Sequence, residues 1–275
     1  MLKKTIAMLA AFLLAAALFA GCAKTKDDAE AIAAQAAAVS DAAAKVEESA
    51  AEDAAAAVTA ANADTASAFY SAYMEGKSAV LSKIMDGLSS NPDTMMSAIS
   101  FLGASMSDIY MLPAMYFGLG EGNVAAALTA MGAKDVVYRE TGNSYSVTYQ
   151  NSEGRETVLN GTYDAGKSLV CTGSTDGVEN IFSETYLTSF GYVGQFYSIA
   201  DDGTATLYQF SVSGENGAIG MTTGKDRPAA LTGDEAADFP KSATEWYAID
   251  GTVITGVNSE GSTVEFTYTP SESND

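Results

Sequence analysis

Few kinds of side chain in this sequence could carry chemistry. There is no histidine, and the two cysteines, Cys22 and Cys171, stand beside 35 acidic and 14 basic residues. The lack of histidine excludes a Ser-His-Asp triad, a Cys-His pair and a His-ligated zinc or iron site. If Cys22 is modified, Cys171 has no partner for a disulfide within the chain, and the core alone must then stabilise the fold.

Carboxylates are the abundant reactive group, yet no spacing singles out a pair. Two carboxyl groups about 5–10 Å apart can hydrolyse a glycoside. The acids at 201–202 and 234–235 could hold Ca²⁺ weakly, but ordinary hairpin and loop chemistry explains them better. Cys171 lies in a strand-like segment, so we expect a small core residue there and not a nucleophile. We therefore predict no enzyme activity, no catalytic residue, no cofactor and no metal site.

The first 22 residues have the order of an export signal. Lys3 and Lys4 precede an apolar run at 5–19, which is too short for a comfortable membrane span, and small residues then lead to Cys22. An ordinary cleaved secretory signal with a chance cysteine is the alternative. The order positive, apolar, small, cysteine and then polar argues against it.

The segment Leu18-Phe19-Ala20-Gly21-Cys22 resembles the lipobox of bacterial lipoproteins, with phenylalanine at 19 where leucine is commoner. The resemblance implies a diacylglyceryl group on the thiol of Cys22, cleavage before that residue, and further acylation such as palmitate. Because a single acyl chain binds a bilayer only marginally, two or three chains on one residue would anchor the protein firmly. We expect an extracytoplasmic protein anchored to the cell membrane, or to the outer or inner membrane if the host has two.

The chain is strongly acidic, with a formal charge of −21 before the two lysines of the signal are removed. Such a surface repels nucleic acid and anionic lipid headgroups, so we expect no nucleic-acid partner and membrane contact only through the anchor. Composition divides the chain into five parts. They are a signal peptide at 1–21, an Ala-rich stem at 22–65, an amphipathic helical segment at 66–134, an antiparallel β-domain at 135–270 and a polar tail at 271–275.

The stem is mostly alanine, the best helix former, with scattered polar residues. Ile32, Val39 and Val46 recur every seven residues, which indicates a coiled-coil seam, but Asp53 breaks the register. A solvated spacer helix, a weak oligomeric coiled coil and a disordered tether all fit, and we favour the spacer. About 40 residues would reach ~60 Å as a helix or ~35 Å as a flexible coil.

Three amphipathic helices are predicted between the stem and the β-domain. The first ends at 87–90 and buries a face at helical spacing. Asn91 is expected to cap the second helix, with Pro92 at its first position. The third runs from Asn123 to Gly132. Their apolar faces comprise Phe69, Tyr73, Val80, Ile84 and Leu88 in the first, Met95, Ile99, Leu102 and Met106 in the second, and Val124, Leu128 and Met131 in the third.

The segment from 135 to 269 alternates apolar and polar residues, as at Tyr145, Val147 and Tyr149, and turn signals interrupt it often. This pattern predicts an α+β fold: a curved antiparallel meander of roughly eight to ten strands, with helices on its inner face. Asn-Ser-Glu-Gly occurs at 151–154 and 258–261. We interpret the repeat as the same type of hairpin turn occurring twice, in preference to an old duplication. The alternation lapses at 224–241, a candidate functional loop in which 234–238 should form a helical turn closed by Pro240.

We expect a non-enzymatic binding or interaction lipoprotein. A protein, a glycan or an apolar small molecule are the possible ligands, and Trp246 and Tyr247 could stack on one, although core packing is the default role of such rings. The first alternative is a structural envelope spacer or assembly subunit that acts through the stem. The second is a carboxylate-dependent hydrolase. An apolar or tyrosine-lined cavity beside 224–241 would favour the binding version.

Overall fold

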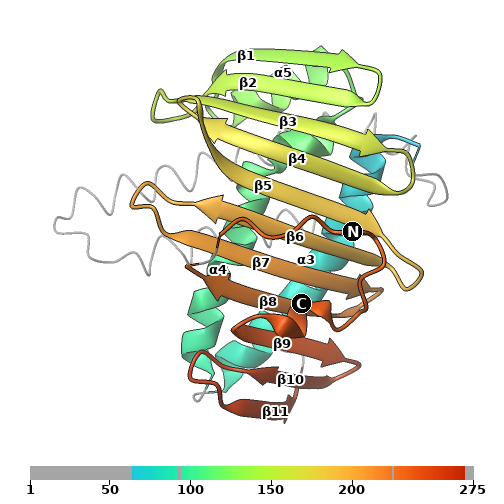
Figure 1. The fold of residues 1–275 in the computed structure, drawn as a ribbon, viewed down its shortest axis with the longest axis vertical. Coiled ribbons are helices and arrows are strands. Elements are labelled where there is room, and N and C mark those ends of the chain that lie inside the picture. The colour runs from blue at the N-terminus through green and yellow to red at the C-terminus, as the bar shows by residue number, and fades with distance from the viewer. Residues whose placement is uncertain (1–63, 92–93, 225, 270–275) are drawn as a thin grey trace, which may run out of the picture.

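Helices come first in the fold and an antiparallel sheet follows. The computed structural model describes residues 64–91, 94–224 and 226–269, so the signal peptide, most of the stem and Cys22 lie outside it. The helices before the sheet are α3 (Ala66–Ser90), α4 (Met95–Tyr110), the short 3₁₀ helix η1 (Leu112–Tyr116) and α5 (Glu121–Ala130). All of them precede the first strand of the sheet (Figure 1).

Eleven strands form one sheet in sequence order, each antiparallel to the next. The predicted α+β meander is confirmed, and the strand count slightly exceeds the expected range. The strands are β1 (Lys134–Thr141), β2 (Ser144–Gln150), β3 (Glu156–Asp164), β4 (Ser168–Thr175), β5 (Val178–Leu187), β6 (Tyr192–Ile199), β7 (Ala205–Ser213), β8 (Asn216–Thr223), β9 (Glu245–Asp250), β10 (Val253–Val257) and β11 (Thr263–Thr267).

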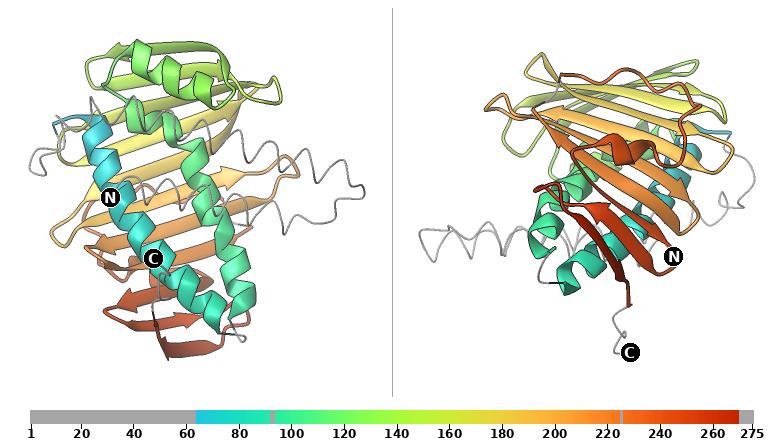
Figure 2. Two further views of the ribbon diagram at one scale, coloured as in Figure 1. Left: turned by 180° about the vertical axis from the view of Figure 1, so that it is seen from behind. Right: turned by 60° about the horizontal axis from the view of Figure 1, so that its bottom comes forward.

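We call the side of the sheet that carries Phe196, Phe210 and Ile219 the inner face, and the helices cover it (Figure 2). Helix α3 starts at the side-chain cap of Thr65, whose hydroxyl accepts a hydrogen bond from the Ala68 N–H at 3.2 Å. The predicted apolar face of α3 is confirmed. Its five residues are all buried: Phe69, Tyr73, Val80, Ile84 and Leu88.

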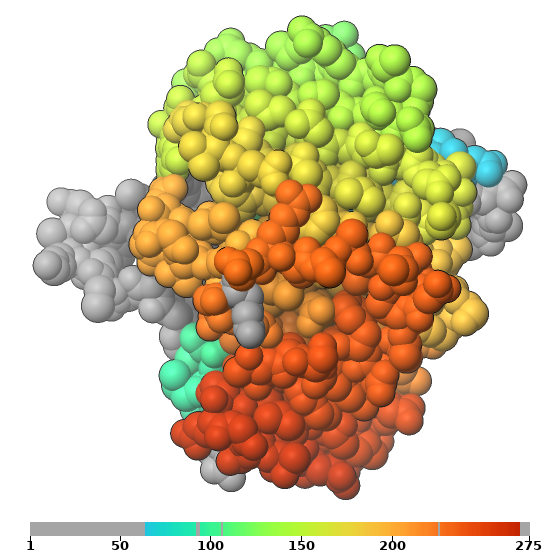
Figure 3. All heavy atoms as spheres, viewed as in Figure 1, coloured from blue at the N-terminus to red at the C-terminus, as the bar shows by residue number. Residues whose placement is uncertain are grey.

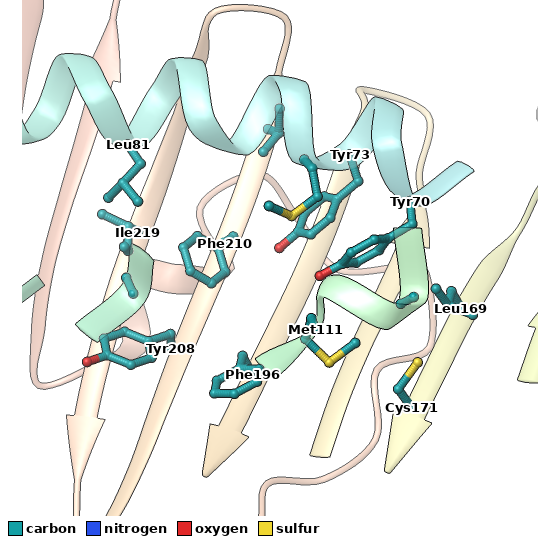
Figure 4. Close-up of a cluster of buried hydrophobic side chains, with 14 of the residues drawn as sticks. Tyr70, Tyr73, Leu81, Met111, Leu169, Cys171, Phe196, Tyr208, Phe210 and Ile219 are labelled. Carbon is teal, nitrogen blue, oxygen red and sulfur yellow. The ribbon is translucent and has the colours of Figure 1, made fainter. Parts of the chain in front are cut away.

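The α3 side chains interlock with those of the strands, as Figure 4 shows for Tyr70, Tyr73 and Leu81 above Phe196, Phe210 and Ile219. Glycines make room for this contact. A Cβ on Gly194 would lie 2.4 Å from the Tyr73 hydroxyl, and one on Gly161 would lie 2.4 Å from the Phe117 ring. Helices and sheet therefore share one hydrophobic core.

The sequence misassigned the start and the faces of α4. Asn91 follows α3 as its C-terminal cap, with its N–H bonded to the Leu88 carbonyl, and α4 begins only at Met95. Among the described side chains of α4, the fully buried ones are mostly small apart from Phe101. Of the predicted face, Leu102 packs against the core, whereas Met95 and Ile99 point to solvent and the Met106 side chain lies outside the described part of the chain, so half of the predicted face is wrong. On α5, Val124 and Leu128 are buried as predicted, whereas Met131 lies beyond the helix end and is 42% exposed.

A buried ion pair joins α3 to α4. Lys77 and Asp108 are 3% and 7% exposed and bond directly to each other. The ammonium of Lys77 also donates to the Ser107 hydroxyl at 3.1 Å and lies 4.3 Å from the centre of the Phe210 ring. Burial raises the pKa of Asp108, and Lys77 opposes that shift. The pair fixes the position of α4 on α3, because a buried charge is tolerated only beside its partner.

Candidate functional site

The predicted functional loop is an extended strap, residues 226–244, which joins β8 to β9. It crosses the outer face of the sheet, the side that carries Glu184, Gln195 and Ser211 and lies opposite the helices (Figure 1). In the space-filling view the strap forms part of the molecular surface over the middle strands (Figure 3). The helical turn expected at 234–238 is not formed. A 3₁₀ turn, η2 (Phe239–Ser242), follows instead and includes Pro240.

Side chains of the sheet hold the main chain of the strap. The buried carboxylate of Glu184 accepts the Leu231 N–H at 2.9 Å and the side-chain amide of Gln195 at 2.6 Å. That same amide of Gln195 donates to the Ala229 carbonyl at 2.9 Å. Glu184 and Gln195 are paired across β5 and β6. Together they supply the hydrogen-bond partners of the Leu231 N–H and the Ala229 carbonyl of the strap.

Further along, the strap lies directly on the sheet. The Ser211 hydroxyl on β7 donates to the Ala237 carbonyl at 2.6 Å. On β8, a Cβ at Gly220 would lie only 2.2 Å from the Pro240 carbonyl oxygen, so glycine is required for η2 to approach this closely. The strap is therefore anchored over β5 to β8 and then turns into β9.

A groove of about 570 Å³ lies beside the C-terminal part of the strap. Its floor is a cross-strand row of small side chains, Ser211, Ala218, Ala248 and Thr255, on four neighbouring strands. Short side chains at four aligned positions leave space that larger ones would fill, and this explains the hollow. The other lining residues are Phe190, Val212, Ser213, Asn216, Gly217, Ala237, Asp238, Lys241, Ile249, Asp250 and Val253.

The charges at the groove come from its rim. Lys241 and Asp238 belong to the strap, and Asp250 ends β9. The Lys241 ammonium also lies 5.2 Å from the centre of the Trp246 ring, which holds the cation at the rim. The groove thus combines a floor of two alanines, a serine and a threonine with a few charged groups at its rim, so it offers a small molecule both apolar and polar contacts.

The aromatic pair predicted to stack on a ligand is split between the faces. Tyr247 is fully buried on the inner face, where it donates to the Ser97 hydroxyl at 2.7 Å and packs edge-on against Phe101. Trp246 is half-buried beside Lys241 on the outer face. Tyr247 therefore serves the core, and of the two only Trp246 lies near the groove.

The other sequence-predicted residues do not gather at the groove. Cys171 is a free, buried thiol on β4, and burial raises its pKa, so it serves as the expected core residue. Asp201 pairs with Arg155 at 3.0 Å, and Asp202 accepts the Thr204 N–H of its own turn at 2.8 Å. The Glu235 carboxylate caps the N–H groups of the strap at Thr232 and Gly233. Across the described residues, no three Cys, Asp or Glu side chains are grouped to hold a metal ion.

Sequence reasoning missed one polar residue. Glu245 starts β9 on the inner face and is 2% exposed, yet neither of its carboxylate oxygens has a hydrogen-bond partner within the described part of the chain. Burial is the largest influence on Glu245 and raises its pKa, while the nearby Ser97 and Tyr247 hydroxyls and the Ser259 main chain oppose this shift. The alternation of β9 predicts that position 245 lies on the inner face. No local sequence pattern predicts how few hydrogen-bond donors reach the Glu245 carboxylate there.

Lipidation at Cys22 falls outside the described residues. None of the helices in the described ranges is long and apolar enough to cross a bilayer. No protein-family model matches this chain, and neither the curated proteins nor the solved structures include a significant match to it.

Proposed function

We propose that this protein is a membrane-anchored extracytoplasmic lipoprotein that binds a small amphiphilic molecule without transforming it. The groove beside the strap is the observation that carries the binding part of this proposal. Its volume lies within the ~300–1,000 Å³ usual for small-molecule sites. Its floor of small side chains, with the methyl groups of Ala218 and Ala248 beside Lys241 and Asp238, suits a ligand with a slim apolar body and a polar end. The order of residues 1–22 supports the anchor.

The anchor is tested on protein purified from the native membrane. Intact-mass analysis should give a chain that starts at Cys22 and carries diacylglyceryl and acyl mass. A Cys22→Ser variant should leave the membrane fraction, because one residue holds all the acyl chains. A chain that retains Met1, or a mature chain without acyl mass, would show that the anchor is wrong.

The groove is tested by NMR titration of the mature chain with dodecanoate as the amphiphile. The amides of Ala218, Ala248 and Thr255 should shift in a saturable way, and Ala248→Phe should abolish the effect by filling the floor. Ala230→Phe is the matched control, because Ala230 is an exposed strap residue away from the groove lining. Shifts with chitotriose in place of dodecanoate would indicate a glycan site, and no shift with either probe would refute the binding proposal.

A further inference from the structure

The first turns of α4 carry apolar residues on their solvent side. Met95, Met96 and Ile99 are 51%, 71% and 43% exposed, whereas Tyr110 at the other end of the helix stacks on the Phe196 ring of the sheet. We call Met95, Met96 and Ile99 the α4 crest. The inward side of the helix is filled separately by Ala98, Phe101 and Ala104. The crest side chains therefore do not contribute to the hydrophobic core.

The crest also lacks charge in a protein that is otherwise strongly acidic. Asp108 is the only ionisable acid or base in α4, and it is buried against Lys77. Exposed helix faces normally carry charged residues, and the formal charge of the chain is −21. An uncharged, Met-rich helix face of this kind is typical of a surface that another helix covers.

The spacing of the apolar residues specifies how that helix would pack. Met95, Ile99, Leu102 and Ile109 follow one another at four, three and seven residues, which is the seam of a two-helix coiled coil. Leu102 and Ile109 are half-buried beside the crest, and Leu102 also packs against the core. The helix offers a seam of about two heptads, ~24 Å long.

The same chain contains a matching seam in its stem. Ile32, Val39 and Val46 alternate with Ala36, Ala43 and Ala50, so apolar residues recur at four and three residues over 32–50. Small alanines between β-branched residues would let this segment approach long methionine side chains closely.

The connection is long enough for the stem to reach the crest. Fifteen residues, 51–65, separate Ala50 from the start of α3, and they span up to ~50 Å when extended. Helix α4 lies beside α3, joined to it through Lys77 and Asp108. Linkage in one chain also gives the stem an effective concentration that a separate partner lacks. A second copy would have to bring another strongly acidic surface close.

We propose that stem residues 32–50 bind as a helix along the α4 crest of the same molecule. In that state only residues 22–31 would link the lipid to the docked stem, so the β-domain would sit close to the membrane. Release of the stem would extend the tether by tens of ångströms. The groove is on the opposite face of the sheet from α4, so it would stay open in both states.

Hydrogen exchange of the mature chain tests this proposal. Amides at 32–50 should exchange at least tenfold more slowly than in a synthetic peptide of that segment. Ile99→Asp should remove the protection. Val178→Asp is the matched control, since Val178 is an even more exposed apolar residue, 68%, at the start of β5, and it should leave the protection intact. Near-UV circular dichroism should show that both variants keep the fold.

Cross-linking gives a second, independent readout. Cysteines at Ala43 and Ile99 should come within reach of a short thiol cross-linker in a monomer, whereas a cysteine at Ala38, on the opposite side of the stem helix, should not. Sedimentation that shows an Ile99-dependent dimer would assign the crest to a second copy and overturn the proposal. Stem amides that exchange as fast as the free peptide would overturn it as well, whatever the state of the groove.

Discussion

The inner and outer faces of the sheet are covered in different ways. On the inner face, rings such as Phe117 and Tyr73 press onto glycines of the strands, and one continuous core reaches the helices. On the outer face, a single strap is held by hydrogen bonds from Glu184, Gln195 and Ser211 to its main chain. The first covering is built from buried apolar area. The second combines polar attachment points with a smaller apolar cluster of Phe182, Tyr197, Ala205 and Leu207.

This difference explains why a groove lies beside the strap. A helix layer can fill the space over a sheet with large side chains. An extended strand of chain covers a width of only about one strand, ~5 Å, so the sheet beside it stays uncovered. We therefore expect changes on the inner face to alter global stability, and changes under the strap to alter local opening.

The largest effect should come from the ion pair inside the helix layer. Lys77→Met leaves the Asp108 carboxylate buried without its partner, so the free energy of unfolding should fall by about 3–5 kcal/mol. Chemical denaturation measures this. The double variant Lys77→Met/Asp108→Leu should recover most of the loss, because it removes both charges. A single variant as stable as the parent would show that the pair does not fix α4.

A matched pair of glycine substitutions compares the two faces directly. In Gly161→Ala the new methyl would overlap the buried Phe117 ring, and in Gly220→Ala it would overlap the Pro240 carbonyl of the strap. The first should lower the free energy of unfolding by about 1–3 kcal/mol through overpacking of the core. The second should leave the global transition nearly unchanged and speed hydrogen exchange at 226–244.

The comparison would fail if the two glycine variants behaved alike. Equal losses of global stability would mean that the strap is part of the cooperative core. If Gly220→Ala left the rate of amide exchange at 226–244 unchanged, η2 could move away from β8 without weakening the hydrogen bonds of the strap to Glu184, Gln195 and Ser211.

Much of the fold follows from local sequence patterns. Helix α3 buries the residues that its helical period selects, and strands such as β3 and β9 keep their two-residue alternation. The repeated Asn-Ser-Glu-Gly segments form the same turn: the side chain of Asn151 accepts the N–H groups of Glu153 and Arg155, and Asn258 accepts those of Glu260 and Ser262. These features depend on residues close in sequence, so the sequence predicts them.

The faces of α4 and the floor of the groove could not be predicted in this way. Helix α4 carries apolar residues on both sides, and its inward side is chosen by the fit of small residues and by Asp108 beside Lys77 on another helix. The groove needs Ser211, Ala218, Ala248 and Thr255 in register on four strands. Such alignment is set by long-range pairing and not by any local period.

Removal of a buried charge that has no cationic partner within the described residues should stabilise the protein. Because burial raises the pKa of Glu245, the folded state binds this proton more tightly than the unfolded chain, whose glutamate pKa is about 4.3. Stability is therefore full below that value and falls as the pH rises through the higher folded pKa. Glu245→Gln removes this loss and should raise the free energy of unfolding at about pH 7 by roughly 1–2 kcal/mol.

Denaturation of both chains from about pH 4 to pH 8 measures the effect of Glu245. The advantage of Glu245→Gln should be small at the acidic end and grow towards neutrality. The opposite trend would mean that the carboxylate has a cationic partner in the folded protein, and that its burial is compensated.

The smallest expected effect lies at the start of the strap. Arg227 pairs with Glu179 at 2.6 Å and lies 3.8 Å from the centre of the Phe182 ring, but its side chain is 46% exposed. Exposed pairs and cation–π contacts contribute only about 0.5–1 kcal/mol each. Arg227→Ala should therefore leave the thermal midpoint almost unchanged and speed amide exchange at 226–232 by roughly two- to fivefold at low salt.

The effect of Arg227→Ala on exchange should shrink as salt is added, since salt screens an exposed ion pair. Arg155→Ala is the control, because Arg155 pairs with Asp176 and Asp201 in hairpin turns and touches no part of the strap. If Arg227→Ala instead lowered global stability as much as Gly161→Ala, the start of the strap would belong to the core. In that case the difference between the packed inner face and the outer face under the strap would not extend to β5, where Glu179 binds Arg227.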